Sequence, residues 1–301
     1  MNSQIPDIFK NYANKEFKMP GQNGIIQIEL QANDDSKTYI KSLLSKAPFL
    51  IQKAMYPDSD YPHFAHIYMM SSSGGILQGD EQKINVMMGK NSTARITTQS
   101  ATKIYKMEDG YASQYIDIHS QEGSYLEFVP HQIIPFKSSR FYQEVNLEVE
   151  NNAVLVYSEI ISSGRIASGE KFDFDLCFLR TSAHRNGRML FTDVMNLSHK
   201  DKVHFESIFG GKDVFSTIYI IGDSIPVEMI TDKINLAVQN TSFLASCSTL
   251  PHNSGIIVRI LADTVSEIVA LTEYVTNILR SFIRKNPSID STTQNSSIDI
   301  A

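Results

Sequence analysis

The sequence predicts a mainly β protein with one or two α-helices near its C-terminus. Short runs rich in β-branched and aromatic residues, bounded by turn residues, fill the first two-thirds of the 301-residue chain. The strongest hairpin signal, Asn186-Gly187, lies between two such runs. The clearest helical periodicity is confined to residues 262–285. These three observations together favour strands first and helices late.

The predicted strands come in pairs, each split by a short turn. The pairs are KINVMM (83–88) with TARITT (93–98), SQYIDIHS (113–120) with SYLEFVP (124–130), QEVNLEVE (143–150) with AVLVYSEI (153–160), and DFDLCFLR (173–180) with RMLFTDVM (188–195). The last pair flanks Asn186-Gly187, two residues that tolerate positive φ and therefore predict a tight hairpin.

The first three pairs recur along the chain. The segments 93–96, 124–127 and 153–156 follow one another at intervals of about 30 residues, a period typical of stacked structural repeats. Evenly spaced hairpins of an ordinary meander have the same appearance. The spacing alone therefore leaves both a stack and a meander open.

The late helix carries its own start and stop signals. Apolar residues recur at helical spacing through ADTVSEIVALTEYVTNILRSFIRK (262–285), and Thr264 with Glu267 forms a capping box at its start. Arg280, Arg284 and Lys285 lie towards its end, where they match the helix dipole, and Pro287 follows. A second, shorter helix is predicted within 227–244. We expect one β-rich domain over residues 1–285 and a mobile polar tail over 286–301.

Composition excludes several classes of protein. Apolar residues make up 42% of the chain, enough for a core, and the net charge of −6 argues against a nucleic-acid surface. The only two cysteines, Cys177 and Cys247, are far apart, which excludes a C-x-x-C zinc site and a disulfide scaffold. No signal-peptide layout and no apolar run of roughly 20 residues occurs. We expect a soluble cytoplasmic protein that binds neither nucleic acid nor membranes.

The segment 71–105 contains partial matches to two catalytic motifs, a phosphate loop and an S-x-x-K tetrad. The glycines of GGILQGD lead to Asp80 and Glu81, and the lysine of a phosphate loop is missing, so a turn that needs positive φ explains them better. Ser100 and Lys103 form an S-x-x-K tetrad, but the helical start signals and the partner motifs of the serine enzymes are absent. A serine hydrolase that uses Ser100 and Lys103 remains an unfavoured alternative.

Histidines offer no specific metal motif. His63 and His66 are three residues apart, and His199 and His204 lie near Asp201, but surface or core histidines are the commoner outcome.

The segment SEIISSGRIASGEKFDF (158–174) is more unusual than these histidines. Glu159 ends an apolar strand, and Gly164 and Gly169 bracket Arg165 just before Glu170. An Arg165–Glu170 ion pair that clamps the turn is the simplest interpretation.

In several of these segments the chain resembles the UreD family of urease accessory proteins, called UreH in some systems. The resemblance rests on ordered blocks, namely Gln52-Lys53 with Tyr56-Pro57, Gly74-Gly75 with Gly79-Asp80, ITTQSATKIY (96–105), LEFVPHQIIPF (126–136), SEIISSGRIASGE (158–170), and VRILADT (258–264) with Leu279-Arg280. The chain departs from the family pattern at Gln78, where a glycine is usual, and at Phe128, where tryptophan is common. Serines also replace the prolines before the Gly-Gly turn.

The resemblance implies a fold and a function. Members of the family fold as a stacked, β-helix-like array with helices near the C-terminus and are not enzymes. They assemble with the helical accessory protein UreF and the GTPase UreG on apo-urease, where nickel is installed. The resemblance therefore implies UreF, UreG and urease as partners, with no tightly bound cofactor and with Ni²⁺ as transient cargo. A scaffold that makes no contact with nickel would share every one of these blocks.

A nickel carrier has a chemical constraint of its own. Ni²⁺ stands high in the Irving–Williams series, so strong Cys/His chelation would trap it, whereas hydroxyls and a few carboxylates would hold it weakly at successive stations. By resemblance we assign such a path to Asp80, Thr98, Glu159 and Asp193. Gly74, Gly75, Gly79, Gly164, Arg165, Gly169 and Glu170 are assigned structural roles.

Overall fold

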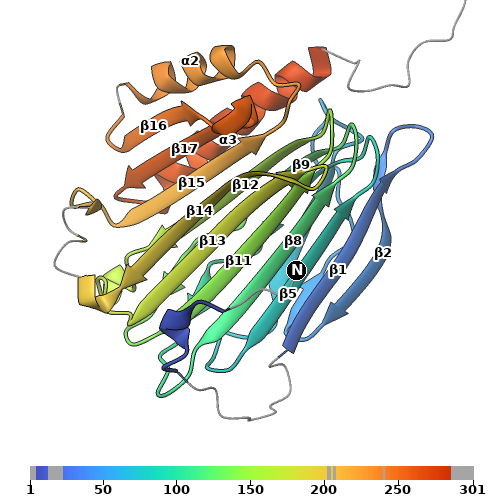
Figure 1. The fold of residues 1–301 in the computed structure, drawn as a ribbon. Helices are drawn as coiled ribbons and strands as arrows, with labels where there is room; N and C mark the ends of the chain where they lie inside the picture. The colour runs from blue at the N-terminus through green and yellow to red at the C-terminus, as the bar shows by residue number, and fades with distance from the viewer. Residues whose placement is uncertain (1–4, 13–22, 202–204, 206–207, 240, 286–301) are drawn as a thin grey trace, which may run out of the picture.

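The computed structural model describes residues 5–12, 23–201, 205, 208–239 and 241–285. They form two β-sheets that face each other, with two helices beside one of them (Figure 1). The tail predicted over 286–301 and His204 lie outside the described residues. Within the described part of the chain, no helix is both long and apolar enough to cross a membrane.

The first sheet, sheet A, has seven strands in the spatial order β14-β13-β11-β8-β5-β1-β2. Their bounds are β1 (Asn23–Ala32), β2 (Thr38–Lys46), β5 (Glu81–Met88), β8 (Ala112–Ser120), β11 (Arg140–Val149), β13 (Leu176–Arg185) and β14 (Arg188–Ser198). Its neighbours from β1 to β13 pair in parallel, and β2 and β14 close the two edges in antiparallel pairing.

The second sheet, sheet B, has the main order β16-β17-β15-β12-β9-β6-β4-β3, and off this path β10 pairs with β12 and β7 pairs with β10. Its strands are β3 (Phe49–Ile51), β4 (Ala65–Ser71), β6 (Thr93–Thr98), β7 (Thr102–Ile104), β9 (Tyr125–Phe128), β10 (Ile133–Pro135), β12 (Val154–Ser162), β15 (Val214–Ile221), β16 (Leu244–Thr249) and β17 (Gly255–Ala262). The helices are α2 (Val227–Val238) and α3 (Val265–Lys285), and short 3-10 turns cover Asp7–Phe9, Ile166–Ser168, His199–Asp201 and Pro251–Asn253.

The recurrence seen in the sequence is one turn of a solenoid. In each of the first three pairs, one strand joins sheet A and the other joins sheet B, and each strand then pairs in parallel with its counterpart from the next turn. The short turns are therefore corners between sheets, with positive φ at Asn91, Gly123 and Asn152. This confirms the predicted stack, which has about four turns in the structure, and excludes the meander.

The hairpin predicted at Asn186-Gly187 is confirmed and ends the parallel stack. Both residues have positive φ, at 52° and 74°, and β13 and β14 pair in antiparallel across them. Sheet B changes to antiparallel pairing as well, where β15 follows β12. The chain thereby leaves the solenoid and reaches the helical C-terminal part.

Apolar clusters stabilise this arrangement, and three of them bear on the site. Two lie between the sheets, one containing Ile84, Ile96 and Ile116 and the other Ile104, Phe141 and Ile161. The third lies on the outer face of sheet B, where the apolar stripe of α3 is buried. The stripe comprises Ile268, Leu271, Val275 and Leu279, and the predicted capping box is present, since the Glu267 N–H donates to Thr264 Oγ1 and the Thr264 N–H donates to Glu267 Oε2.

Candidate functional site

The Gly-Gly turn before β5 is a tightly packed structural element. A Cβ on Gly75 would lie 2.5 Å from the Lys103 carbonyl oxygen and 2.6 Å from the Tyr105 ring, so a side chain there has no room. Gly79 has φ of 82°, and the Leu77 N–H donates to Asp80 Oδ2 at 2.8 Å. Asp80 therefore caps its own turn, and burial raises the pKa of its carboxyl.

Gly75→Ala is expected to destabilise the protein by about 1–3 kcal/mol, because the new methyl group forces backbone and ring apart. Urea unfolding followed by circular dichroism measures the change. The control is Gly74→Ala, since the nearest atom there is the Tyr105 hydroxyl at 2.9 Å, at the end of a side chain that can move. Equal losses in both variants would contradict this account of Gly75.

The second turn, after β12, is held by an ion pair. Arg165 Nε donates to Glu170 Oε2 at 2.8 Å, and a second contact joins the Arg165 guanidinium to Glu170 Oε1. The Lys137 N–H also donates to Glu170 Oε2, and the Arg165 guanidinium lies over the Phe136 ring. The hydrogen bonds from Arg165 lower the pKa of Glu170. Gly164 has φ of 145°, and a Cβ on it would meet the Glu170 carbonyl oxygen at 2.7 Å.

A band of polar side chains crosses the interior between the two apolar clusters. Sheet A contributes Gln82, Gln114 and Gln143, which occupy one row because the parallel register pairs Gln82 with Gln114 and Gln114 with Gln143. Thr98 on β6 and Glu159 on β12 face these glutamines from sheet B. Side chains two positions apart on a strand lie on the same face, so Thr98 points inward like Ile96, and Glu159 points inward like Tyr157 and Ile161. The interior is thus apolar above and below a polar layer.

This layer surrounds a cavity of about 210 Å³. Its walls include Thr98, Glu159, Tyr157 and the three glutamines. Gln114 Nε2 donates to Gln82 Oε1 at 2.8 Å, and Gln143 Nε2 donates to the Tyr157 hydroxyl at 3.0 Å. Gln143 Oε1 is buried and accepts no hydrogen bond from the described residues. The volume far exceeds the roughly 15 Å³ that one water needs, so the cavity can hold a hydrated ion.

Glu159 is the carboxylate of this cavity. It is 5% exposed, and the Tyr157 hydroxyl donates to its Oε2 at 3.3 Å. Burial, with a smaller contribution from the charge of Asp193, raises the pKa of Glu159 to about 7. Near neutral pH the side chain is therefore present in both protonated and ionised forms, so it can release a proton when a cation arrives.

The structure brings two of the four proposed path residues together. Thr98 and Glu159 line the same cavity, whereas Asp80 lies in its turn and Asp193 on β14, and neither is among the lining residues. Asp193 Oδ2 accepts hydrogen bonds at 2.6 Å from the Tyr219 hydroxyl and from Arg259 Nη2. The Asp193 carboxylate is therefore already paired with the Arg259 guanidinium of β17.

The alternative chemistries gain little from the geometry. Ser100 and Lys103 both line the cavity, but Ser100 lies in a bend before β7 and not on a helix, and within the described ranges the two side chains share no hydrogen bond. The same part of the chain contains no group of three or more His, Cys, Asp or Glu side chains placed to hold a metal. His63 lies in a loop and His66 in β4, so they do not share a helix face.

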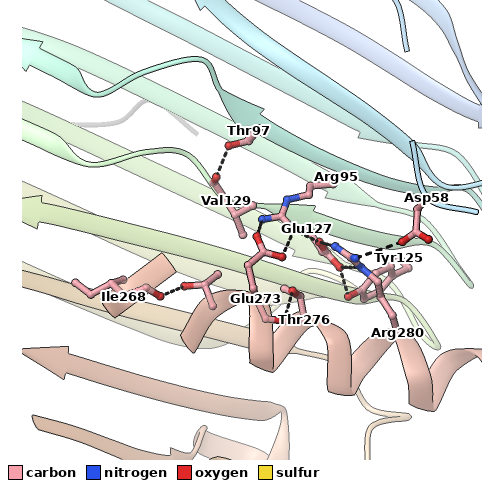
Figure 2. A network of polar contacts seen from close by, with 11 residues as sticks. Asp58, Arg95, Thr97, Tyr125, Glu127, Val129, Ile268, Glu273, Thr276 and Arg280 are labelled. Atoms are coloured by element: carbon pink, nitrogen blue, oxygen red, sulfur yellow. Dashed lines mark hydrogen bonds and ion pairs between the residues drawn. The ribbon is translucent and has the colours of Figure 1, made fainter. Parts of the chain in front are cut away.

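Sequence reasoning missed a buried ion-pair network between sheet B and α3. Glu127 is 0% exposed on β9, and Arg280 of α3 donates to both its oxygens at 2.6 Å (Figure 2). The Tyr125 hydroxyl also donates to Glu127, while Arg95 lies 3.4 Å from Glu127 and pairs with Glu273 (Figure 2). Arg280 therefore anchors α3 to sheet B, a role that its place near the helix C-terminus did not predict. Glu127 lies in the block LEFVPHQIIPF and Arg280 follows Leu279, but neither block indicates that the two residues meet.

The comparisons with known proteins decide the family. The family model described as UreD urease accessory protein matches residues 22–294. The chain belongs to the UreD family. The urease accessory protein UreD of Cenarchaeum symbiosum is 33% identical over 86% of this chain and 92% of its own length. UreD 2 of Streptomyces griseus is 29% identical over 90% and 94%, and UreD of Photorhabdus laumondii is 31% identical over 83% and 79%. All three are named as accessory proteins and none as an enzyme, and the family assignment agrees with the ordered sequence blocks that resembled UreD.

Proposed function

We propose that this chain acts in urease maturation as the scaffold that joins UreF and the GTPase UreG to apo-urease, and that Ni²⁺ crosses its interior on the way to the urease active site. The observation that carries the proposal is the polar cavity between the sheets, with Glu159 as its carboxylate. Membership of the UreD family supplies the connection to urease.

The side chains that line the cavity suit an ion that must be bound and then released. Thr98, Tyr157 and the glutamine amides offer neutral oxygens, Glu159 offers one ionisable carboxylate, and His131 offers a single imidazole. Nickel prefers nitrogen and sulfur donors, and imidazole suits it well, so an oxygen-rich interior binds it weakly. Weak binding at several points favours transfer over storage, as in ion conduction. Asp80 and Asp193 are proposed as flanking stations, outside the cavity itself.

Glu159→Ala is expected to lower the nickel content and activity of co-expressed urease roughly tenfold, a magnitude typical of disturbed metal sites, while the complex still assembles. The experiment co-expresses the variant with UreF, UreG and apo-urease, isolates the complex by pulldown, and measures urease nickel by mass spectrometry. Unchanged nickel in an assembled complex would leave a scaffold that makes no contact with nickel.

The matched control is Glu148→Ala. Glu148 lies on β11 and lines a trough on the outer face of sheet A, so the variant makes the same chemical change away from the cavity. It is expected to leave urease nickel unchanged. Ser100→Ala tests the hydrolase alternative in the same assay, because urease activation that survives this substitution excludes a nucleophilic role for Ser100.

A further inference from the structure

Sheet B is interrupted beside the cavity. Pairing between β9 and β12 ends at Phe128–Tyr157 and resumes only at Ile133–Ile161, where β10 begins. Pro130 explains the break, because proline has no N–H to donate to a neighbouring strand. Residues 129–132 thus lie opposite residues 158–160 but do not pair with them as strands, because four residues on one side face three on the other.

The partner strand on the other side compensates with side chains. Thr97 Oγ1 donates to the Val129 carbonyl oxygen at 2.7 Å, and Thr98 Oγ1 accepts the His131 N–H at 2.9 Å. The segment 129–132 is therefore held to β6, and the loosened side of the break faces β12. Extending the register beyond Phe128 places Pro130 between Thr98 and Glu159, at the level of the polar layer.

Two cavities meet at this break. The inner cavity and a second pocket of about 420 Å³ on the outer face of sheet B share Pro130, His131 and Ile160 as lining residues. The outer pocket lies against α3, since Thr272 and Glu273 of that helix also line it. The same three residues can line both pockets only if they form the wall between them.

The outer pocket has polar atoms without partners. Ser158 is 1% exposed, and its Oγ makes no hydrogen bond within the described part of the chain. The same holds for His66 Nε2, which is also buried and lines the pocket. Buried polar atoms usually have a partner, so these two indicate bound water or another polar guest. Arg95 and Arg280 line the pocket too, but Glu127 and Glu273 neutralise them.

We propose that the break at residues 129–132 is a side opening of the inner cavity, through which a hydrated divalent cation passes between the cavity and the outer pocket beside the His131 imidazole. The passage of a cation rests on the proposed function, whereas the opening itself does not. Imidazole suits nickel better than the hydroxyls and amides on either side, and His131 is the imidazole that lines both cavities, whereas His66 lines the outer pocket alone. Water or a partly hydrated ion in the outer pocket would give Ser158 Oγ and His66 Nε2 the partners that they lack among the described residues.

The opening is tested without nickel. Gln114→Cys places a thiol in the cavity wall, in a Cys247→Ser background, while Cys177 is fully buried. Ser73, Ser100 and Lys103 line the cavity and are exposed, so the cavity has a mouth there, which Ser100→Trp is designed to block. Labelling by the small neutral reagent methyl methanethiosulfonate is followed by mass spectrometry. The thiol is expected to react still, and a further His131→Trp substitution is expected to slow that reaction at least tenfold. Loss of labelling with Ser100→Trp alone, or no further slowing with His131→Trp, would overturn the proposal.

The role of His131 is tested by His131→Ala, which removes the imidazole but leaves the opening wide. Thiol labelling is expected to be no slower, while urease nickel content falls roughly tenfold in the co-expression assay. If nickel is unchanged with His131→Ala but falls with Glu159→Ala, the proposed function stands and the cation does not use this opening. If neither variant lowers nickel, the proposed function fails while the labelling result still decides the opening. Thermal unfolding of each variant shows that it is folded.

Discussion

Replacing Arg280 by alanine is expected to destabilise the protein by about 3–5 kcal/mol, the usual consequence of removing one partner of a buried ion pair. The reason is the environment of Glu127, which is 0% exposed and receives two hydrogen bonds at 2.6 Å from Arg280. Without them its charge stays buried, and Arg95, at 3.4 Å and already paired with Glu273, is a weaker substitute. Urea unfolding monitored by far-UV circular dichroism measures the loss.

Two further variants separate the ion pair from general damage to α3. Lys171→Ala breaks an ion pair with Asp213 whose side chains are 38% and 24% exposed, and it is expected to change stability by about 1 kcal/mol or less. The double variant Glu127→Gln/Arg280→Met removes both charges, keeps an acceptor for the Tyr125 hydroxyl, and is expected to recover much of the loss. A double variant as unstable as Arg280→Ala would show that packing, and not the unpaired charge, dominates.

The solenoid was predictable because its signal is periodic. Each turn repeats the same order of a strand, a corner and a second strand, so the spacing of segments 93–96, 124–127 and 153–156 reports the pitch of the stack. What the spacing cannot distinguish is a corner from a hairpin, since asparagine and glycine with positive φ serve both. Only the resemblance to a known family resolved this before the structure did.

The polar layer was only partly predictable. Glu159 and Thr98 were identified through the family blocks, and both line the cavity. Gln82, Gln114 and Gln143 were missed, because a glutamine in an alternating strand is normally taken for a solvent-facing residue. A signal was present, however, since these glutamines recur at the same interval of about 30 residues as the strands and must stack if the strands do.

The Glu127–Arg280 pair could not have been predicted from local pattern. The two residues are 153 positions apart, and neither lies in a motif with its own chemistry. Their contact requires α3 to cross the outer face of sheet B at the position of β9. That position is set by the apolar packing along the whole of α3. Arginine near a helix C-terminus already satisfies a local rule, so its presence there gave no reason to expect a tertiary ion pair.

Glu159→Gln is expected to stabilise the protein at pH 8 by about 3 kcal/mol relative to its effect at pH 4. The pKa of Glu159 is about 7 in the folded state against 4.5 in the unfolded chain, and a tenfold difference in proton affinity between the two states corresponds to about 1.4 kcal/mol. Below pH 4.5 the carboxyl is protonated in both states and adds nothing. As the pH rises from 4.5 to 7, the unfolded chain loses the proton while the folded chain keeps it, so stability falls, and above 7 the penalty is constant.

Glutamine carries no charge at any pH, so the difference in unfolding free energy between variant and wild type should follow this curve. Urea unfolding at half-unit steps from pH 4 to pH 8 measures it. Glu267→Gln provides a control of opposite sign, because hydrogen bonds from Ser242 and Thr264 lower the pKa of Glu267, and wild type gains from that carboxylate as the pH rises. A flat difference curve for Glu159→Gln would mean that water reaches the cavity freely enough to solvate the charge. The buried carboxylate would then not be the group that exchanges a proton for a cation.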